Sequence, residues 1–234
     1  MTRAWVYLRD ARLADALALA EKAAVTIEPR FSTSSPEALT VYGSHVNSAA
    51  VVASRMGDSD RAADYLSRSH ATGARMGNEH GAYGTLFGPV TATTQAVGIK
   101  VSLGQTGQAL DLIDSIGDVS QLQPAAQHRY AMDTALAQAD ARMGDSALDT
   151  LEGALEDAPE WARHQALPGV IAEKIGAGST ARLRKVAKVL GVQPVPREPR
   201  GGRRSGSALR ALNTCTGRTS SHHAAPNARM SHTS

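Results

Sequence analysis

The sequence predicts an all-α fold of stacked antiparallel helical pairs, followed by a disordered basic tail. Three observations support this prediction. Through residues 1–190, apolar residues recur at spacings of three and four, and no stretch shows the alternation typical of strands. Glycine or another small residue interrupts this spacing at similar intervals. Beyond residue 190 only isolated apolar residues remain, and no aromatic residue follows Trp161.

In the first helical pair, the first helix is expected to be short. Residues 5–8, from Trp5 to Leu8, form only a stub of a first helix, whereas Leu13, Leu17 and Ala20 lie on one face of a second helix. A stacked pair normally needs both helices to cover its apolar face. We therefore expect an incompletely covered N-terminal end, and association or poor solubility as its consequence.

The third helix has the clearest start signals in the chain. Ser34 and Ser35 offer a hydroxyl cap, Pro36 fits the first turn, and Glu37 lies where the helix dipole favours an acid. Gly57 ends this helix. The later helices follow from the same spacing, with the longest loop expected at 75–87; their expected ranges are 60–76, 89–103, 109–116, 124–143, 148–155, 161–175 and 179–190.

The joints between paired helices repeat along the chain. They centre on Ala11, Gly57, Gly104 and Gly144, at spacings of 46, 47 and 40 residues. A small residue follows each joint, so that the two helices can approach closely; these residues are Ala16, Ala62, Ala109 and Ala147. A glycine turn followed by a buried alanine is typical of tetratricopeptide-type helical pairs. The predicted architecture is therefore a tetratricopeptide-like helical-repeat solenoid over residues 1–190, with 191–234 as a low-complexity tail.

Composition excludes several classes of protein. The single Cys215 excludes a disulfide framework and a cysteine-based zinc site. No glycine-rich phosphate loop is present, and no apolar run reaches the roughly 20 residues that a membrane helix needs. The first ten residues lack the apolar region of a secretory signal. We expect a cytoplasmic protein that is not an enzyme and that has no cofactor, no metal and no membrane partner.

The net charge of +3 hides two unlike regions. Residues 191–234 contain seven Arg and one acid, which leaves 18 basic and 21 acidic groups in residues 1–190. The body therefore lacks the basic surface expected of a DNA-binding domain. For the tail, the sequence leaves open a nucleic-acid-binding arm or an out-of-frame translation of GC-rich DNA, and the second fits its Arg, Gly, Ser and Pro bias better.

Several stretches resemble a known family. They are Ser35-Pro-Glu-Ala-Leu-Thr-Val-Tyr-Gly43, Phe87-Gly-Pro89, the Val97–Gly107 segment and Ala109-Leu-Asp-Leu112. These are similar to the C-terminal tetratricopeptide-like region of actinobacterial XRE-type helix-turn-helix transcriptional regulators, over roughly residues 5–190. The resemblance implies a repeat region that senses a ligand or dimerises, in a protein whose separate N-terminal domain binds the operator.

The chain departs from that family pattern in three places. It begins inside the repeat region, without the DNA-reading helices. Val90-Thr91 and Gln95 stand where the family pattern has Thr-Asn and His. The tail beyond Val192 resembles nothing in the family. We therefore expect a truncated regulator, with DNA contacted only through a module absent from this chain.

The candidate site is a polar groove on the first helices of two successive pairs. Polar side chains on these helices can bind a peptide or a small molecule, and the alternative is that they form an ordinary solvated helix face. The candidate groove residues are Ser44, His45, Asn47, Thr91, Thr94 and Gln95. His70 and His80 flank the glycine-rich loop, but their spacing fits no helical pair of metal ligands.

The expected function is the ligand-sensing or protein-interaction (dimerisation) region of a bacterial transcriptional regulator. The expected partners are a protein or peptide, or a second copy of the chain. The alternative is a stand-alone tetratricopeptide adaptor that scaffolds other proteins. The adaptor hypothesis predicts protein partners that are independent of DNA.

Overall fold

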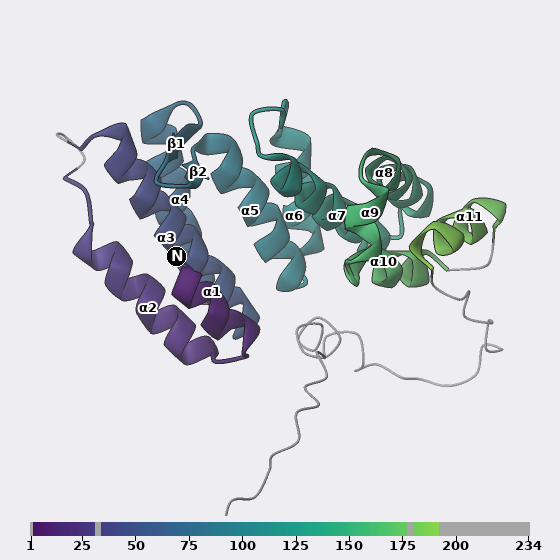
Figure 1. The fold of residues 1–234 in the computed structure, drawn as a ribbon, viewed down its shortest axis with the longest axis horizontal. Coiled ribbons are helices and arrows are strands. Elements are labelled where there is room, and N and C mark those ends of the chain that lie inside the picture. Colours follow the sequence, from purple (N-terminus) through teal and green to yellow (C-terminus); the bar gives the residue numbers. More distant parts are fainter. Residues whose placement is uncertain (1, 31–33, 177–179, 192–234) are drawn as a thin grey trace, which may run out of the picture. The chain divides into compact units, whose positions relative to one another are not determined.

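A computed structural model describes residues 2–30, 34–176 and 180–191, all of which belong to the unit Met1–Gly202. The expected tail, apart from Gly191, lies outside the described residues. Within these residues the chain forms helices and one two-stranded sheet, so the all-α prediction is confirmed (Figure 1). No described helix combines the length and the apolar character needed to cross a membrane.

The N-terminal half contains six helices and a hairpin. They are α1 (Thr2–Arg9), α2 (Leu13–Thr26), α3 (Pro36–Arg55), α4 (Ser59–Met76), β1 (His80–Ala82), β2 (Thr85–Phe87), α5 (Pro89–Ser102) and α6 (Thr106–Ser115). The cap of α3 is as predicted, since the side chain of Ser35 accepts a hydrogen bond from the amide of Ala38. The remaining helices are α7 (Pro124–Asp140), α8 (Gly144–Asp157), α9 (Pro159–Arg163), α10 (Leu167–Ile175) and α11 (Ala181–Leu190).

Two expected elements differ in the structure. The loop expected at 75–87 contains an antiparallel hairpin, in which His80 pairs with Phe87 and Ala82 with Thr85. Tyr83 and Gly84 form its two-residue turn at φ 49° and 75°, and strands of three residues are too short to reveal alternation. The single helix expected at 161–175 is divided into α9 and α10, because Pro168 lacks the amide that would bond to the carbonyl of His164, four residues earlier.

Four helix joints share one backbone conformation. The residues Ala11, Gly57, Gly104 and Arg142 have left-handed φ values of 58°, 76°, 70° and 64°. In every joint, the amide of the following residue donates to the carbonyl five positions before it, at 2.9 or 3.0 Å. This bond satisfies a carbonyl that the end of the helix would otherwise leave unpaired. The joints are therefore local structural repeats.

The structure moves the fourth joint from Gly144 to Arg142, two residues earlier. Glycine occupies the left-handed position in only two of the four joints. The position of a glycine was therefore not a sufficient guide to the fourth joint. With Arg142 as the reference, the buried alanine follows five residues later in all four joints. Each of these alanines is 0% exposed; they are Ala16, Ala62, Ala109 and Ala147. The offset is therefore uniform, whereas Ala147 follows Gly144 by only three residues.

Arg142 and Ala11 adopt a conformation that costs an ordinary L-residue roughly 1 kcal/mol. We expect Arg142→Gly to raise the free energy of unfolding by about 1 kcal/mol, measured by urea denaturation. Arg142→Ala is the matched control, because it removes the exposed side chain but keeps the Cβ. A glycine variant no more stable than the alanine variant would contradict the shared joint geometry.

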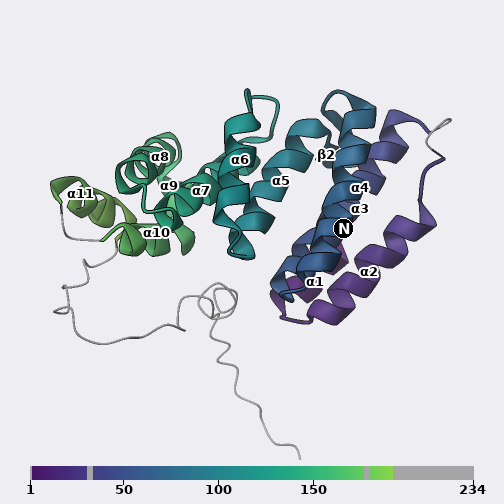
Figure 2. The same ribbon diagram turned by 180° about the vertical axis from the view of Figure 1, so that it is seen from behind.

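Helices pack mainly on their neighbours in the chain and on helices two or three places further on. The first helices of successive pairs contact one another, α3 with α5, α5 with α7 and α7 with α10. The second helices α4, α6 and α8 each contact the first helix of the following pair. Figures 1 and 2 allow this order to be followed from both sides. The first helices thus form a continuous row that positions the candidate site.

Candidate functional site

Two adjoining cavities lie along the row of first helices. The hairpin-side cavity, of about 150 Å³, lies against α3, α5 and the strand β2. The α7-side cavity, of about 120 Å³, lies against α3, α5 and α7. Trp5 of α1, Val51 of α3 and Gln95 of α5 line both, so the two cavities are neighbours. We call them together the first-helix groove.

Four of the six predicted groove residues line the hairpin-side cavity: Ser44, Asn47, Thr91 and Gln95. The other two are not among the described residues that line either cavity. His45 is half-buried on α3, and Thr94 is 7% exposed, with its hydroxyl donating to the carbonyl of Val90 at 2.9 Å. The structure thus places predicted residues of α3 and α5 around one cavity. From the sequence, these two helices could be grouped only by comparison with tetratricopeptide folds.

Hydrogen bonds fix the polar side chains of α3. The hydroxyls of Ser44 and Thr85 lie 2.8 Å apart and share a hydrogen bond between α3 and the hairpin. The amide oxygen of Asn47 accepts from the hydroxyl of Ser69 on α4 at 2.6 Å. This leaves the amide N–H groups of Asn47 as donors without an acceptor among the described residues. The side chain of Gln95 likewise makes no hydrogen bond within the described part of the chain.

The hairpin is anchored by the motif Phe87-Gly88-Pro89. The ring of Phe87 is 0% exposed and covers Gly43, where an added Cβ would lie 2.2 Å from a ring carbon. Gly88 admits close contact with the preceding backbone, since a Cβ there would lie 2.6 Å from the carbonyl oxygen of Asn78. Pro89 begins α5 in the first turn, where its missing N–H costs nothing.

Glu79 caps α5 from the far side of the hairpin. Gly88, at the N-terminal boundary of α5, has no side chain that could cap it. One carboxylate oxygen of Glu79 accepts from the amides of Val90 and Thr91 at 2.8 and 3.0 Å, and the other accepts from the hydroxyl of Thr91 at 2.5 Å. These amides would otherwise be unpaired at the start of the helix. The cap therefore holds Thr91 in place at the groove.

The α7-side cavity is charged. Asp133 of α7 is 6% exposed, and both its oxygens accept from the Nε of Arg129, at 3.1 and 3.0 Å. Burial raises the pKa of Asp133, while Arg129 and Arg55 oppose this rise. Gly98 of α5 makes room for the carboxylate, since a Cβ there would lie 2.6 Å from an Asp133 oxygen.

Sequence reasoning missed several lining residues. Trp5 was assigned only to a stub of helix, although it is 50% exposed and lines both cavities. Thr85 lay in the stretch expected to be a loop. Arg55 and Asp133 were not assigned to any site from the sequence. The half-exposed tryptophan was the signal that could have pointed to the groove, because such residues are enriched at binding surfaces.

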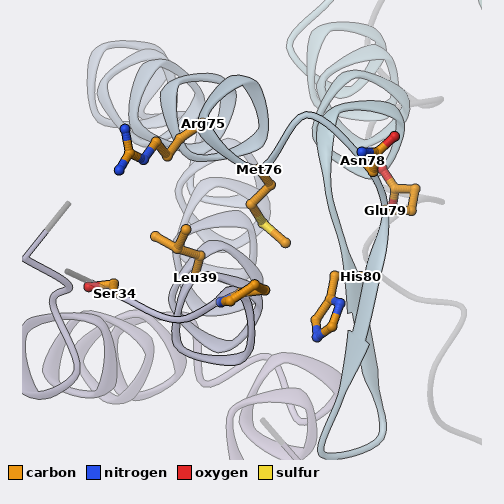
Figure 3. A pocket seen from close by; sticks show the side chains of 8 residues that line it. Ser34, Leu39, Arg75, Met76, Asn78, Glu79 and His80 are labelled. Atoms are coloured by element: carbon orange, nitrogen blue, oxygen red, sulfur yellow. The ribbon is translucent and has the colours of Figure 1, made fainter. Parts of the chain in front are cut away.

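A larger cavity of about 430 Å³ lies near the N-terminus of α3, the C-terminus of α4 and the strand β1 (Figure 3). Leu39 and Met76 lie in the middle of its lining, and Arg75 points away from them. Glu79 and His80 of its lining are engaged within the protein, since Glu79 caps α5 and the Nε2 of His80 lies 3.5 Å from the carboxylate of Glu37. We therefore place the candidate site in the first-helix groove.

The histidines of the described residues form no metal site. No three His, Cys, Asp or Glu side chains of the described ranges lie close enough together to hold an ion. His70 of α4 and His80 of β1 lie in separate surroundings. His80 faces Glu37, whereas the buried Nε2 of His70 has no hydrogen-bond partner among the described residues.

Burial lowers the pKa of both His45 and His70 below the ordinary value of 6.5. Below about pH 6.5 the unfolded chain takes up protons that the folded chain refuses. We expect the free energy of unfolding to fall as the pH decreases through this range. Urea denaturation at a series of pH values from about 7.5 to about 5 measures how the free energy of unfolding changes with pH. The wild type is compared with the double variant His45→Gln/His70→Gln. An equal pH dependence in both proteins would contradict the conclusion that His45 and His70 cause it.

Comparisons with known proteins found nothing similar: no family model, no curated protein and no solved structure matches the chain. The features of the molecule that bear on its function are the joints, the row of first helices and the groove that these helices line. Two properties of the groove matter most. It runs along successive helices, and its lining includes the side-chain amides of Asn47 and Gln95 and the indole of Trp5.

Proposed function

We propose that the chain is a tetratricopeptide-like repeat module that binds an extended peptide segment of a partner in the first-helix groove. The observation that carries the proposal is the run of two adjoining cavities along α3, α5 and α7. Repeated helical pairs use such rows of first helices as extended binding surfaces. The four matching joints and the order of helix contacts support the solenoid reading of the fold.

The dimensions of the groove favour a peptide over a small molecule. Pockets for small ligands usually enclose about 300–1,000 Å³. The two cavities have volumes of about 150 and 120 Å³ and adjoin at Trp5, Val51 and Gln95. Separate shallow cavities of this kind suit successive side chains of an extended segment. The free amide groups of Asn47 and Gln95 can bond to its backbone.

The biological setting that we propose is a bacterial transcriptional regulator, in which this region senses a ligand or partner. The support is the resemblance around Phe87-Gly88-Pro89, whose three residues each have a structural role in the hairpin or at the start of α5. A stand-alone adaptor would use the same groove. Identification of the bound partner separates the two hypotheses. The regulator hypothesis requires a DNA-binding module, either in the partner or in a continuation of this chain, whereas the adaptor hypothesis does not.

Peptide binding is tested by panning a displayed library of random peptides against the purified chain. The affinity of a selected peptide is then measured by titration calorimetry. Loss of one amide partner costs about 1 kcal/mol, so we expect Gln95→Ala to weaken binding about fivefold. Gln108→Ala on α6 is the matched control, because Gln108 is exposed away from both cavities. Failure to select any peptide, or equal affinity for both variants, would contradict the proposal.

A further inference from the structure

The α7-side cavity contains more positive than negative charge. Its lining includes the guanidinium groups of Arg55 and Arg129 and the single carboxylate of Asp133. Asp133 is nearly buried, and Arg55 is half-buried on the last turn of α3. The three side chains come from α3 and α7, which are separated by α5 in the row of first helices. The cavity therefore has a net charge of +1 from its ionised side chains.

The carboxylate of Asp133 is committed to one of the two arginines. Both of its oxygens accept from the Nε of Arg129, which leaves the Nη groups of Arg129 without an acceptor among the described residues. Arg55 forms no salt bridge with any carboxylate of the described ranges. Burial, together with repulsion from Arg129, lowers the pKa of Arg55, and Asp133 only partly offsets this. A half-buried guanidinium in this position lacks the anion that such groups usually pair with.

We propose that the α7-side cavity binds a carboxylate of the partner peptide between Arg55 and Arg129. This inference rests on the proposed peptide-binding function and specifies its chemistry. The guanidinium groups supply several N–H donors in planar arrays that match the two oxygens of a carboxylate. A single carboxylate neutralises the net charge of +1 in this cavity, whereas a dianionic phosphate would leave an uncompensated negative charge beside Asp133. The preferred partner is thus an acidic peptide and not a phosphorylated one.

The residues that line the groove next to Arg55 and Arg129 indicate which peptide residues would flank the bound carboxylate. Trp5 and Val51 adjoin the charged cavity and offer an apolar surface. Gln95 lies at the junction of the two cavities. The segment that fits the groove therefore has an acidic residue next to an apolar one, with its backbone along Gln95 and Asn47. A partially desolvated cavity strengthens the charge pairing relative to the open surface.

The test uses arrays of short peptide mixtures in which one position is fixed as Asp, Glu, Asn, Gln or phosphoserine. Each mixture is made with a free and with an amidated C-terminus, so that side-chain and terminal carboxylates are distinguished. Binding of the labelled full-length chain is measured on all of them. We expect the acidic mixtures, or the free termini, to bind about tenfold more tightly than their neutral counterparts. The preference should decrease from roughly 0.05 M to 0.5 M salt.

Substitutions test whether the preference for acidic peptides depends on the α7-side cavity. Arg55→Gln should abolish the tenfold preference while binding of the neutral mixtures persists, and Arg55→Lys should retain part of it. Arg184→Gln, at an exposed arginine of α11, is the matched control and should keep the preference. Arg55 forms no salt bridge to a described residue, so these substitutions should leave the fold intact, which circular dichroism checks.

The possible failures are distinguishable. If the wild type binds no mixture at all, the proposed peptide-binding function fails, and this inference fails with it. If the mixtures bind but acidic and neutral ones bind equally, the inference is overturned while the proposed function stands. The same holds if Arg55→Gln and Arg184→Gln have equal preferences. Tighter binding of phosphoserine than of glutamate mixtures would overturn the choice of a carboxylate.

Discussion

Replacing Phe87 with alanine is expected to lower the free energy of unfolding by about 3 to 5 kcal/mol. The ring is 0% exposed and fills the space above Gly43, so its loss leaves a cavity between α3 and the hairpin. The helix α3 has no side chain at this position that could move in to fill the space. Urea denaturation at constant pH measures the loss directly.

Tyr83→Ala is the matched control for Phe87→Ala. Tyr83 is an aromatic residue of the same hairpin but is 87% exposed at its tip. We expect this control to change stability by no more than about 0.5 kcal/mol. The reciprocal change Gly43→Ala should also destabilise the protein, by about 1 to 3 kcal/mol, because its Cβ would overlap the ring. Equal stability of Phe87→Ala and Tyr83→Ala would show that the hairpin is not part of the core.

Replacing Arg129 with methionine is expected to lower the free energy of unfolding by about 3 kcal/mol at neutral pH. The substitution keeps an apolar stem but leaves the carboxylate of Asp133, which is 6% exposed, without its hydrogen-bond donor. Arg55 alone then opposes the cost of burying this charge. The double variant Arg129→Met/Asp133→Leu removes both charges and should recover most of the loss.

The deficit of Arg129→Met should depend on pH in a defined direction. Burial raises the folded-state pKa of Asp133 above its ordinary value of 3.8, and removal of Arg129 raises it further. A raised acid pKa means that stability is lost as the pH increases through the folded-state value. Denaturation should therefore reveal the largest deficit near pH 7 and a small one near or below about pH 4. A deficit independent of pH would contradict an ion pair between Arg129 and the buried carboxylate of Asp133.

Helical periodicity predicted most of the fold because helix packing acts at short range in the sequence. The start of α3 followed from Ser35 and Pro36, whose capping roles depend on adjacent residues alone. The joints followed from small residues at fixed offsets. The one displaced joint, at Arg142, adopts a left-handed conformation without glycine, and only its surroundings in the folded chain stabilise that conformation.

The hairpin could not be predicted from local pattern. Its strands have three residues each, and its stability comes from Phe87 packing on Gly43, more than forty residues away. The cap of α5 is similarly non-local, because Glu79 reaches across the hairpin to the amides of Val90 and Thr91. Contacts of this kind depend on the tertiary arrangement and leave no periodic trace in the sequence.

The candidate site was predicted in part. The polar residues Ser44, Asn47, Thr91 and Gln95 could be grouped because they occupy first helices of successive pairs. Trp5, Arg55 and Asp133 could not, because their joint position depends on how α1, α3 and α7 pack. Composition and spacing could not distinguish the half-buried Arg55 from the exposed arginines of other helix faces.

The position of a bound peptide tests the central claim most directly. A photo-crosslinking amino acid at position 95 faces the first-helix groove, whereas the same group at position 67 lies on the exposed face of α4. A library-selected peptide is irradiated with each variant, and the products are resolved by mass spectrometry. We predict efficient crosslinking from position 95 and little from position 67. Equal yields from both positions, or a higher yield from 67, would contradict binding in the groove.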